Sequence, residues 1–191
     1  MLGATALATR VYIFNFMSVL TVFSMAITKG MQIFIGQLVG ARKQDDAYHY
    51  MFMGLKIALV ITVIIGGLFT VFGRQIFSVF TDDPGIIALG SSILVLELIL
   101  QPARTGNLII ISALRAAGDA KFPVLIGITV MWGVLVPLAY YLAIHLGMGL
   151  PGIWLAMLTD EWIRATLMFL RWKKKRWIGK SIANAELEPY K

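Results

Sequence analysis

The 191-residue chain is 59% hydrophobic, carries a formal net charge of +7 and has a mean hydropathy of +0.81. Soluble domains are only about 45–50% apolar, and a soluble monomer of this composition would expose apolar patches larger than monomers tolerate. The absence of cysteine excludes disulfides and thiolate metal sites. The two histidines, His49 and His145, are far apart in the sequence, so we expect no metal site and no cofactor.

Five stretches of the chain have the length and apolar character of membrane-spanning helices, which need about 20 mostly apolar residues. They cover residues 5–39, 51–72, 84–114, 122–146 and 150–170. The segments between them, such as 73–85, contain Gly, Pro, Asp or charged residues and are predicted to be connections. We therefore predict an all-α, polytopic transmembrane helix bundle over residues 1–177, followed by a cytoplasmic tail at 178–191.

Lysine and arginine collect on one predicted side of the membrane, in the connections at 40–46 and 115–123 and in the run RWKKKRW at 171–177. The positive-inside rule places this side, with the C-terminus, in the cytoplasm. Five spans then put the N-terminus outside, which suggests that a segment is missing upstream. A basic chain can also bind nucleic acid, but a cluster that directly follows an apolar segment favours a membrane surface. We expect a multi-pass protein of the cell (inner) membrane, with the lipid bilayer as partner and no nucleic acid.

Ionisable residues inside spans are costly, and by default they mark a functional site or a buried partner. Six such residues remain after the connections are set aside, together with Arg10 near the start of the chain and Lys56 near the cytoplasmic start of its span, which can snorkel. They are Lys29, Glu97, Arg104, Asp160, Glu161 and Arg164. A rise of ~1.5 Å per residue puts most of them near the middle of a ~30 Å hydrocarbon core. Three are positive and three negative, so one interpretation is mutual neutralisation, with Asp160 and Arg164 paired at i, i+4. The other is a role in transport for Lys29, Glu97 and Arg104.

Two polar residues, Gln101 and Asn107, lie near Arg104 at helical spacing around Pro102. Transporters often build midplane sites from interrupted helices with polar groups, although hydrogen bonds between helices are the alternative. No Ser/His/Asp set is visible, so we predict that the chain is not an enzyme. The residues predicted to form a substrate or ion pathway are Glu97, Arg104, Asn107, Lys29, Asp160, Glu161 and Gln101.

Three segments of the chain contain motifs of a known protein family: ALRAAGDAKFP at 113–123, LGMGLPGIWLAMLTDEWIRA at 146–165, and residues 6–43. The first two resemble the end of multidrug and toxic compound extrusion (MATE) transporters, and 6–43 is similar to the second helix of each of their lobes. The resemblance implies a twelve-helix fold of two six-helix lobes, of which this chain resembles the last five helices. The missing N-terminal lobe and seventh helix would be partners. The implied function is secondary antiport of small organic, often cationic, drug-like compounds in exchange for Na⁺ or H⁺.

One departure from the family pattern concerns the coupling ion. The resemblance implies that Na⁺-coupled members have an Asp followed three residues later by a Gln in this helix. Counted back without gaps from LRAAGD, the matching positions of this chain hold Arg104 and Asn107. Because arginine cannot ligate a cation, the usual cation site of this lobe is not expected here; Glu97, Asp160 or Glu161 could replace it, or coupling could lie in the absent lobe. Alternative functions are a lipid-linked oligosaccharide flippase of a related branch and an inactive truncated membrane subunit.

Overall fold

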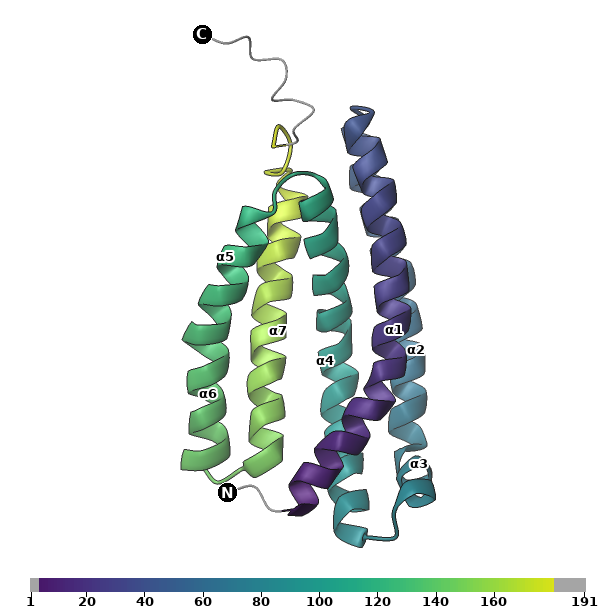
Figure 1. Cartoon of the computed structure of the whole chain (residues 1–191), viewed down its shortest axis with the longest axis vertical. Helices are drawn as coiled ribbons and strands as arrows, with labels where there is room; N and C mark the ends of the chain where they lie inside the picture. Colours follow the sequence, from purple (N-terminus) through teal and green to yellow (C-terminus); the bar gives the residue numbers. More distant parts are fainter. Residues whose placement is uncertain (1–3, 181–191) are drawn as a thin grey trace.

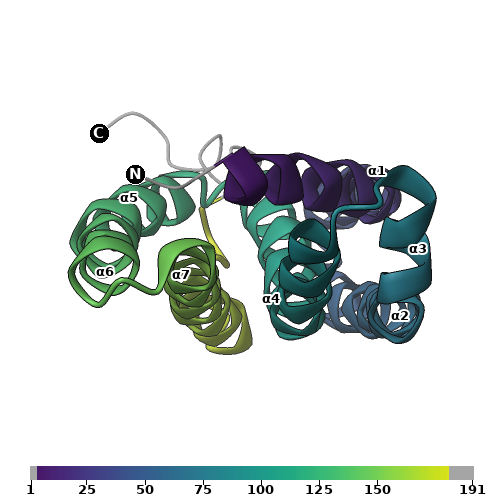
Figure 2. The same cartoon turned by 90° about the horizontal axis from the view of Figure 1, so that it is seen from below.

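The computed structural model describes residues 4–180, and part of the predicted tail, 181–191, lies outside these described residues. Long helices run side by side along the bundle, and α4 lies in its centre (Figures 1 and 2). The helices are α1 (Ala4–Gly40), α2 (Gln44–Val71), α3 (Gly73–Phe80), α4 (Pro84–Ala116), α5 (Lys121–Val130), α6 (Val136–Tyr140) and α7 (Gly149–Lys173). Two π-helical turns, η1 (Met131–Leu135) and η2 (Tyr141–His145), flank α6.

Four stretches are long and apolar enough to cross a membrane: Thr5–Gly40, Gln44–Val71, Pro84–Ala116 and Lys121–His145. The fifth predicted span corresponds to α7, whose 25 residues reach about 37 Å, more than the ~30 Å hydrocarbon core. Its charges at Asp160, Glu161 and Arg164 make α7 less apolar than the other four stretches. It nevertheless runs beside α4 along the bundle, as a spanning helix would (Figure 1). The structure confirms an all-α transmembrane bundle.

The helix bounds differ from the predicted ones mainly at two places. The second helix begins at Gln44 rather than 51, because its polar first turn, with Asp45 and Asp46, continues the helix beyond the apolar stretch. The predicted connection 73–85 was wrong for its first part, which forms the short helix α3. Packing of Phe77 explains why this segment is helical and held against the bundle, because its ring is fully buried and its centroid lies 5.2 Å from that of Phe16. Gly90 leaves room for that ring.

Two apolar clusters form the core, one toward each end of the bundle. The first includes Trp172 and Trp177, whose stacked rings lie 4.4 Å apart. The second includes Phe16, Phe77 and Leu94. Between the two clusters, the middle of α4 carries polar and charged side chains. The fold therefore places those side chains between the two apolar clusters, near the middle of the bundle.

The basic end of the bundle, defined by the loops at 41–43 and 117–120 and the turn at 174–180, is held by ion pairs. Asp119 is buried and accepts hydrogen bonds from Arg171 Nε at 2.7 Å and Lys180 Nζ at 2.8 Å. Burial raises the pKa of Asp119, but the hydrogen bonds and positive charges of Arg171 and Lys180 together outweigh it and hold the pKa below its ordinary value. At the start of α2, Asp45 contacts Lys175 Nζ at 2.6 Å, which lowers the pKa of Asp45.

The contact between α7 and the preceding π-helical turn depends on Gly152. A Cβ added there would lie 2.9 Å from the backbone nitrogen of Ala143 and 2.9 Å from the carbonyl carbon of Leu142. Because backbone atoms cannot rotate away, only glycine allows this close approach. The contact joins the last two spanning segments near the turn that connects them.

Replacing Gly152 by alanine is expected to destabilise the protein by about 1–3 kcal/mol, the usual cost of overpacking. The melting temperature of detergent-solubilised protein measures the effect. Gly127→Ala is the matched control, because an added Cβ at Gly127 meets nothing within 4 Å, and alanine is the better helix former. Equal losses of melting temperature in the two variants would contradict the close contact at Gly152.

Replacing Asp119 by asparagine is expected to cost about 1.5–3 kcal/mol at neutral pH, because it removes charge-assisted hydrogen bonds. The folded-state pKa of Asp119 lies below the unfolded value of 3.8. The stabilisation is therefore complete above that value and is lost as the pH falls through the folded pKa. Thermal unfolding at a series of pH values checks this, and a gap between wild type and Asp119→Asn that persists in strong acid would contradict it.

Candidate functional site

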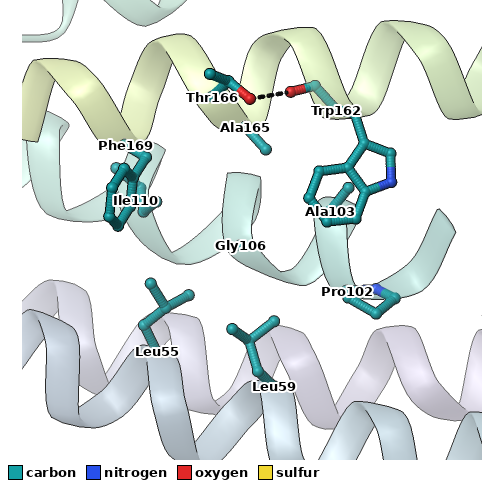
Figure 3. Close-up of a pocket in the computed structure, with 10 residues that line it drawn as sticks. All are labelled: Leu55, Leu59, Pro102, Ala103, Gly106, Ile110, Trp162, Ala165, Thr166 and Phe169. Carbon is teal, nitrogen blue, oxygen red and sulfur yellow. Dashed lines mark hydrogen bonds between the residues drawn. The ribbon is translucent and has the colours of Figure 1, made fainter. Parts of the chain in front are cut away.

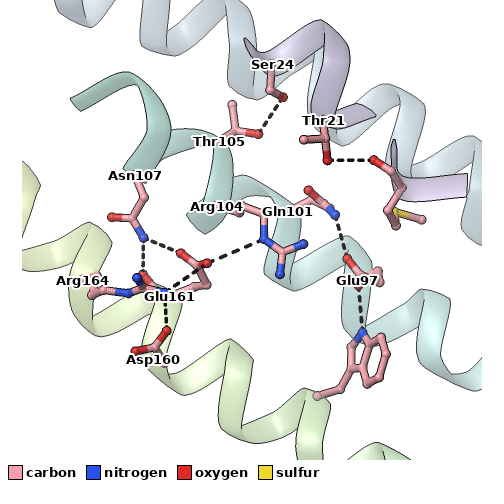
Figure 4. A network of polar contacts seen from close by, with 12 residues as sticks. Thr21, Ser24, Glu97, Gln101, Arg104, Thr105, Asn107, Asp160, Glu161 and Arg164 are labelled. Atoms are coloured by element: carbon pink, nitrogen blue, oxygen red, sulfur yellow. Dashed lines mark hydrogen bonds and ion pairs between the residues drawn. The ribbon is translucent and has the colours of Figure 1, made fainter. Parts of the chain in front are cut away.

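The polar residues in the middle of the bundle lie mainly between α4 and α7, which run in the same direction (Figures 1 and 4). Two contacts define how the helices are aligned. Glu97 contacts Trp154, and Arg104 contacts Glu161. Both pairs are separated by 57 residues in the sequence, so the second contact repeats the first after two helical turns. This alignment brings side chains from distant parts of the chain into one polar layer.

Glu97 is buried, with 3% of its surface exposed, and accepts a hydrogen bond on each carboxylate oxygen. Gln101 Nε2 donates to Oε2 at 2.8 Å, and Trp154 Nε1 donates to Oε1 at 2.8 Å. Gln101 belongs to the next turn of α4, and Trp154 reaches across from α7 (Figure 4). Within residues 4–180, Glu97 forms no ion pair with a basic side chain. Its two neighbours orient the carboxyl group without neutralising it.

A second group, two turns closer to the basic end, contains four charges that neutralise one another. Arg104 Nε lies 3.6 Å from Glu161 Oε1, and Arg164 Nη2 lies 3.2 Å from the same oxygen. Arg164 also pairs with Asp160, one turn earlier on α7. Two positive and two negative charges give this cluster a formal charge of zero. The predicted pair between Asp160 and Arg164 is therefore present, within a larger network.

Asn107 ties the charged cluster to α4. Its Nδ2 donates to the Glu161 carboxylate at 2.6 Å and to the Glu161 backbone carbonyl at 2.9 Å. Two buried oxygens in the cluster, Asn107 Oδ1 and Asp160 Oδ1, have no hydrogen-bond partner within the part of the chain that the structure describes. Buried polar atoms are normally paired, so these oxygens have the capacity to accept a proton donor or a cation. No group of three or more His, Asp or Glu side chains gathers into a metal site in the described part of the chain.

Lys29 lies outside both groups. It is on an exposed part of α1 and takes part in no ion pair with the described residues. Apart from Lys29, the structure divides the predicted set into two groups: Glu97 and Gln101 lie together, and the other four residues lie in the charged cluster. That cluster contains Arg104, Asn107, Asp160 and Glu161.

Two features of the site were not predicted from the sequence. Trp154 was not recognised as a hydrogen-bond donor to Glu97. A signal was available, because Trp154 follows Glu97 by the same 57 residues that separate Arg104 from Glu161. The other is a set of hydroxyls that joins three helices. Thr105 on α4 lies 3.3 Å from Ser24 Oγ on α1 and 3.1 Å from Thr62 Oγ1 on α2, between hydroxyl oxygens. Hydroxyl pairs of this kind stabilise helix contacts within membranes.

Glu161 is expected to be a structural counter-ion of Arg104 and Arg164. Glu161→Gln leaves the cluster with a net positive charge and should cost up to about 3–5 kcal/mol of stability, because one partner of a largely buried ion pair is lost. Arg104→Gln alone should cost a similar amount, whereas the double variant restores neutrality and should lose less than the sum. Melting temperatures of the three purified variants measure this coupling. Strictly additive losses would contradict the paired arrangement.

Comparison with known proteins gives an independent line of evidence. The MatE family model matches residues 1–141. The chain is 44% identical over 182 residues to a protein named uncharacterized transporter YisQ, from Bacillus subtilis (strain 168), covering 95% of this chain and 40% of that protein. It is 28% identical over 194 residues to a probable multidrug resistance protein, NorM, of Pasteurella multocida (strain Pm70), covering 100% of this chain and 42% of that protein.

A further relative is a probable multidrug resistance protein, NorM, of Streptococcus pneumoniae (strain ATCC BAA-255 / R6), which is 28% identical over 159 residues. The match covers 83% of this chain and 35% of that protein. The chain thus spans about two fifths of the length of the curated relatives it matches. The MatE proteins are transporters rather than enzymes, and the family model covers well over half of these residues. The chain therefore belongs to the MatE family of membrane transporters.

Proposed function

We propose that this chain is part of a secondary antiporter that exports small organic compounds, often cationic and drug-like, in exchange for Na⁺ or H⁺. The MatE family match and the multidrug resistance names of several relatives support this function. Because the chain spans about two fifths of its relatives' length, the proposal includes an N-terminal lobe and a seventh helix as partners. The same names favour drug export over the flippase alternative.

Glu97 is the observation that carries the proposal. Glu97 is buried near the middle of the bundle and has no basic partner among residues 4–180. A charge in that position is expensive in a membrane, so binding of a mobile cation would stabilise it. Proton, Na⁺ and an organic cation are all suitable, and they compete because one carboxyl group binds one of them at a time. Such competition at a buried carboxyl is the basis of exchange. Gln101 and Trp154 would hold the carboxyl group in position through each step.

The charged cluster has a different proposed role. Arg104 and Arg164 already neutralise Asp160 and Glu161. A transported cation would therefore stabilise these two carboxylates less than it would stabilise Glu97. We assign them to the alignment of α4 with α7, which places Trp154 against Glu97. Asn107 Oδ1 and Asp160 Oδ1, which have no hydrogen-bond partner among the described residues, are the atoms of the cluster that remain suited to contact a passing ion.

Lys29 belongs to a second proposed surface. Asn15, Ser18 and Lys29 are exposed along α1 and lie within one broad face at 100° per residue. Polar groups facing lipid are disfavoured, so we propose that this face meets the rest of the transporter or its substrate pathway. The basic end would face the cytoplasm of a cell with the protein in its inner membrane, in accordance with the positive-inside rule.

Glu97→Gln is expected to reduce ion-driven efflux of ethidium, an organic cation, by about tenfold or more. The reason is that a charge-assisted contact contributes ~1.5–3 kcal/mol. Efflux is measured in vesicles that contain the complete transporter, under imposed Na⁺ and proton gradients in turn. Asp82→Asn is the charge-matched control, because Asp82 is exposed in the loop before α4. Trp154→Phe should give an intermediate loss.

Two results would overturn parts of this proposal. Unchanged efflux in correctly inserted Glu97→Gln protein would exclude Glu97 as the exchange site. Full antiport by the 191 residues alone would show that no further lobe is needed. If the chain is instead an inactive membrane subunit, neither gradient drives efflux, whether or not Glu97 is intact.

A further inference from the structure

A groove on the opposite side of α4 from Glu97 is separate from the polar layer. It has a volume of about 310 Å³ and is lined by α2, α4 and α7 (Figure 3). Gly106 and Pro102 form its floor, with Leu55 and Leu59 on one side and Trp162 and Phe169 on the other. On α4, Gly106 and Glu97 are nine residues apart, which at 100° per residue places them on opposite faces. The proposed exchange site therefore does not use the groove.

The lining of the groove selects an apolar occupant. Its single hydroxyl, on Thr166, already donates to the backbone carbonyl of Trp162 at 2.8 Å (Figure 3). No charged side chain lines the groove. A polar or charged compound would therefore lose hydration without gaining a partner, whereas a hydrocarbon chain would lose nothing.

Two lysines stand near the groove: Lys173 lies one turn beyond Phe169 toward the basic end, and Lys56 lies between the lining residues Leu55 and Leu59. Lys173 follows Phe169 by four residues on α7, and Lys56 precedes Leu59 by three residues on α2, so each lies close to the groove-lining strip of its helix. Both are exposed, and neither pairs with an acidic residue of the described chain. Within the neighbouring basic run, Arg171 and Lys175 are instead engaged with Asp119 and Asp45.

The directions of the two helices bring these lysines toward one level. Side chains in an α-helix tilt toward its N-terminus. The N-terminus of α2 is at the basic end, so Lys56 tilts toward that end, whereas Lys173, at the C-terminal end of α7, tilts back toward the groove. Long lysine side chains in membranes also extend to the interface. Two positive charges above an apolar groove match an anionic headgroup above an acyl chain.

We propose that this groove, together with Lys56 and Lys173, is a binding site for an anionic phospholipid. The acyl chain occupies the groove against Trp162, and the headgroup phosphate lies between the two ammonium groups. The proposal depends on the membrane bundle alone, so it stands or falls independently of the exchange function assigned to Glu97.

Bromine atoms on lipid chains quench tryptophan fluorescence at contact, so Trp162 can report on the occupant of the groove. The full chain is reconstituted in phosphatidylcholine bilayers that contain either brominated phosphatidylglycerol or brominated phosphatidylcholine. The Trp162 contribution is the difference between wild type and Trp162→Phe. We expect this contribution to be quenched at lower mole fractions of the anionic lipid, with an affinity ratio of about fivefold for each lysine.

Variants separate the headgroup contact from the chain contact. Lys56→Gln/Lys173→Gln should remove the preference for phosphatidylglycerol, whereas Lys56→Arg/Lys173→Arg should retain it. Arg74→Gln/Lys121→Gln is the control with the same change of charge at exposed positions away from the groove. Gly106→Leu should fill the groove and reduce quenching of Trp162 by both lipids, because an added Cβ there points toward Leu55 Cδ1 at 3.9 Å.

Equal quenching by the two lipids in wild type would overturn the proposal, since it would show ordinary contact with bulk lipid. A preference that survives in the Lys→Gln double variant would also overturn it, as would undiminished quenching in Gly106→Leu. Displacement of brominated phosphatidylglycerol by ethidium at this site would assign the groove to transported compounds instead.

Discussion

The fold of this protein depends on one constraint: charged groups in the middle of a bilayer must find partners within the protein. Water is absent there, so an uncompensated charge costs several kcal/mol. The interface of α4 and α7 meets this constraint with a four-charge cluster around Glu161. We propose that the cluster aligns α4 with α7 and so places Trp154 against Glu97. Structure and proposed exchange are thus linked through the same pair of helices.

Glu97 differs from the other carboxylates because its two neighbours are neutral donors. Gln101 and Trp154 orient it but do not supply charge, whereas Glu161 has two guanidinium groups within reach. This contrast explains how one polar layer can combine a rigid part with an exchangeable part. The family resemblance led us to expect no cation site at Arg104, because an arginine cannot ligate a cation. Glu97, seven residues earlier on the same helix face, is our proposed substitute.

Much of the fold was predictable because hydrophobic length is a strong signal in membrane proteins. The helix 73–80 was missed because it is short and its one decisive residue, Phe77, is buried by contacts with α1 and α4. The site was only partly predictable. Local pairs such as Asp160 and Arg164 follow from helical spacing, but the contact of Trp154 with Glu97 requires the relative alignment of two helices. Exposure of Lys29 depends on tertiary packing, which the sequence of one helix does not reveal.

Release of a bound cation on substrate binding tests the role of Glu97 most directly. Ethidium is titrated into the purified transporter in weakly buffered detergent solution, while a pH indicator and a Na⁺ electrode record any ion that is released. Exchange at Glu97 predicts stoichiometric release of a proton or of Na⁺ in wild type and none in Glu97→Gln. Equal release by both proteins would contradict the assignment of Glu97 as the exchange site.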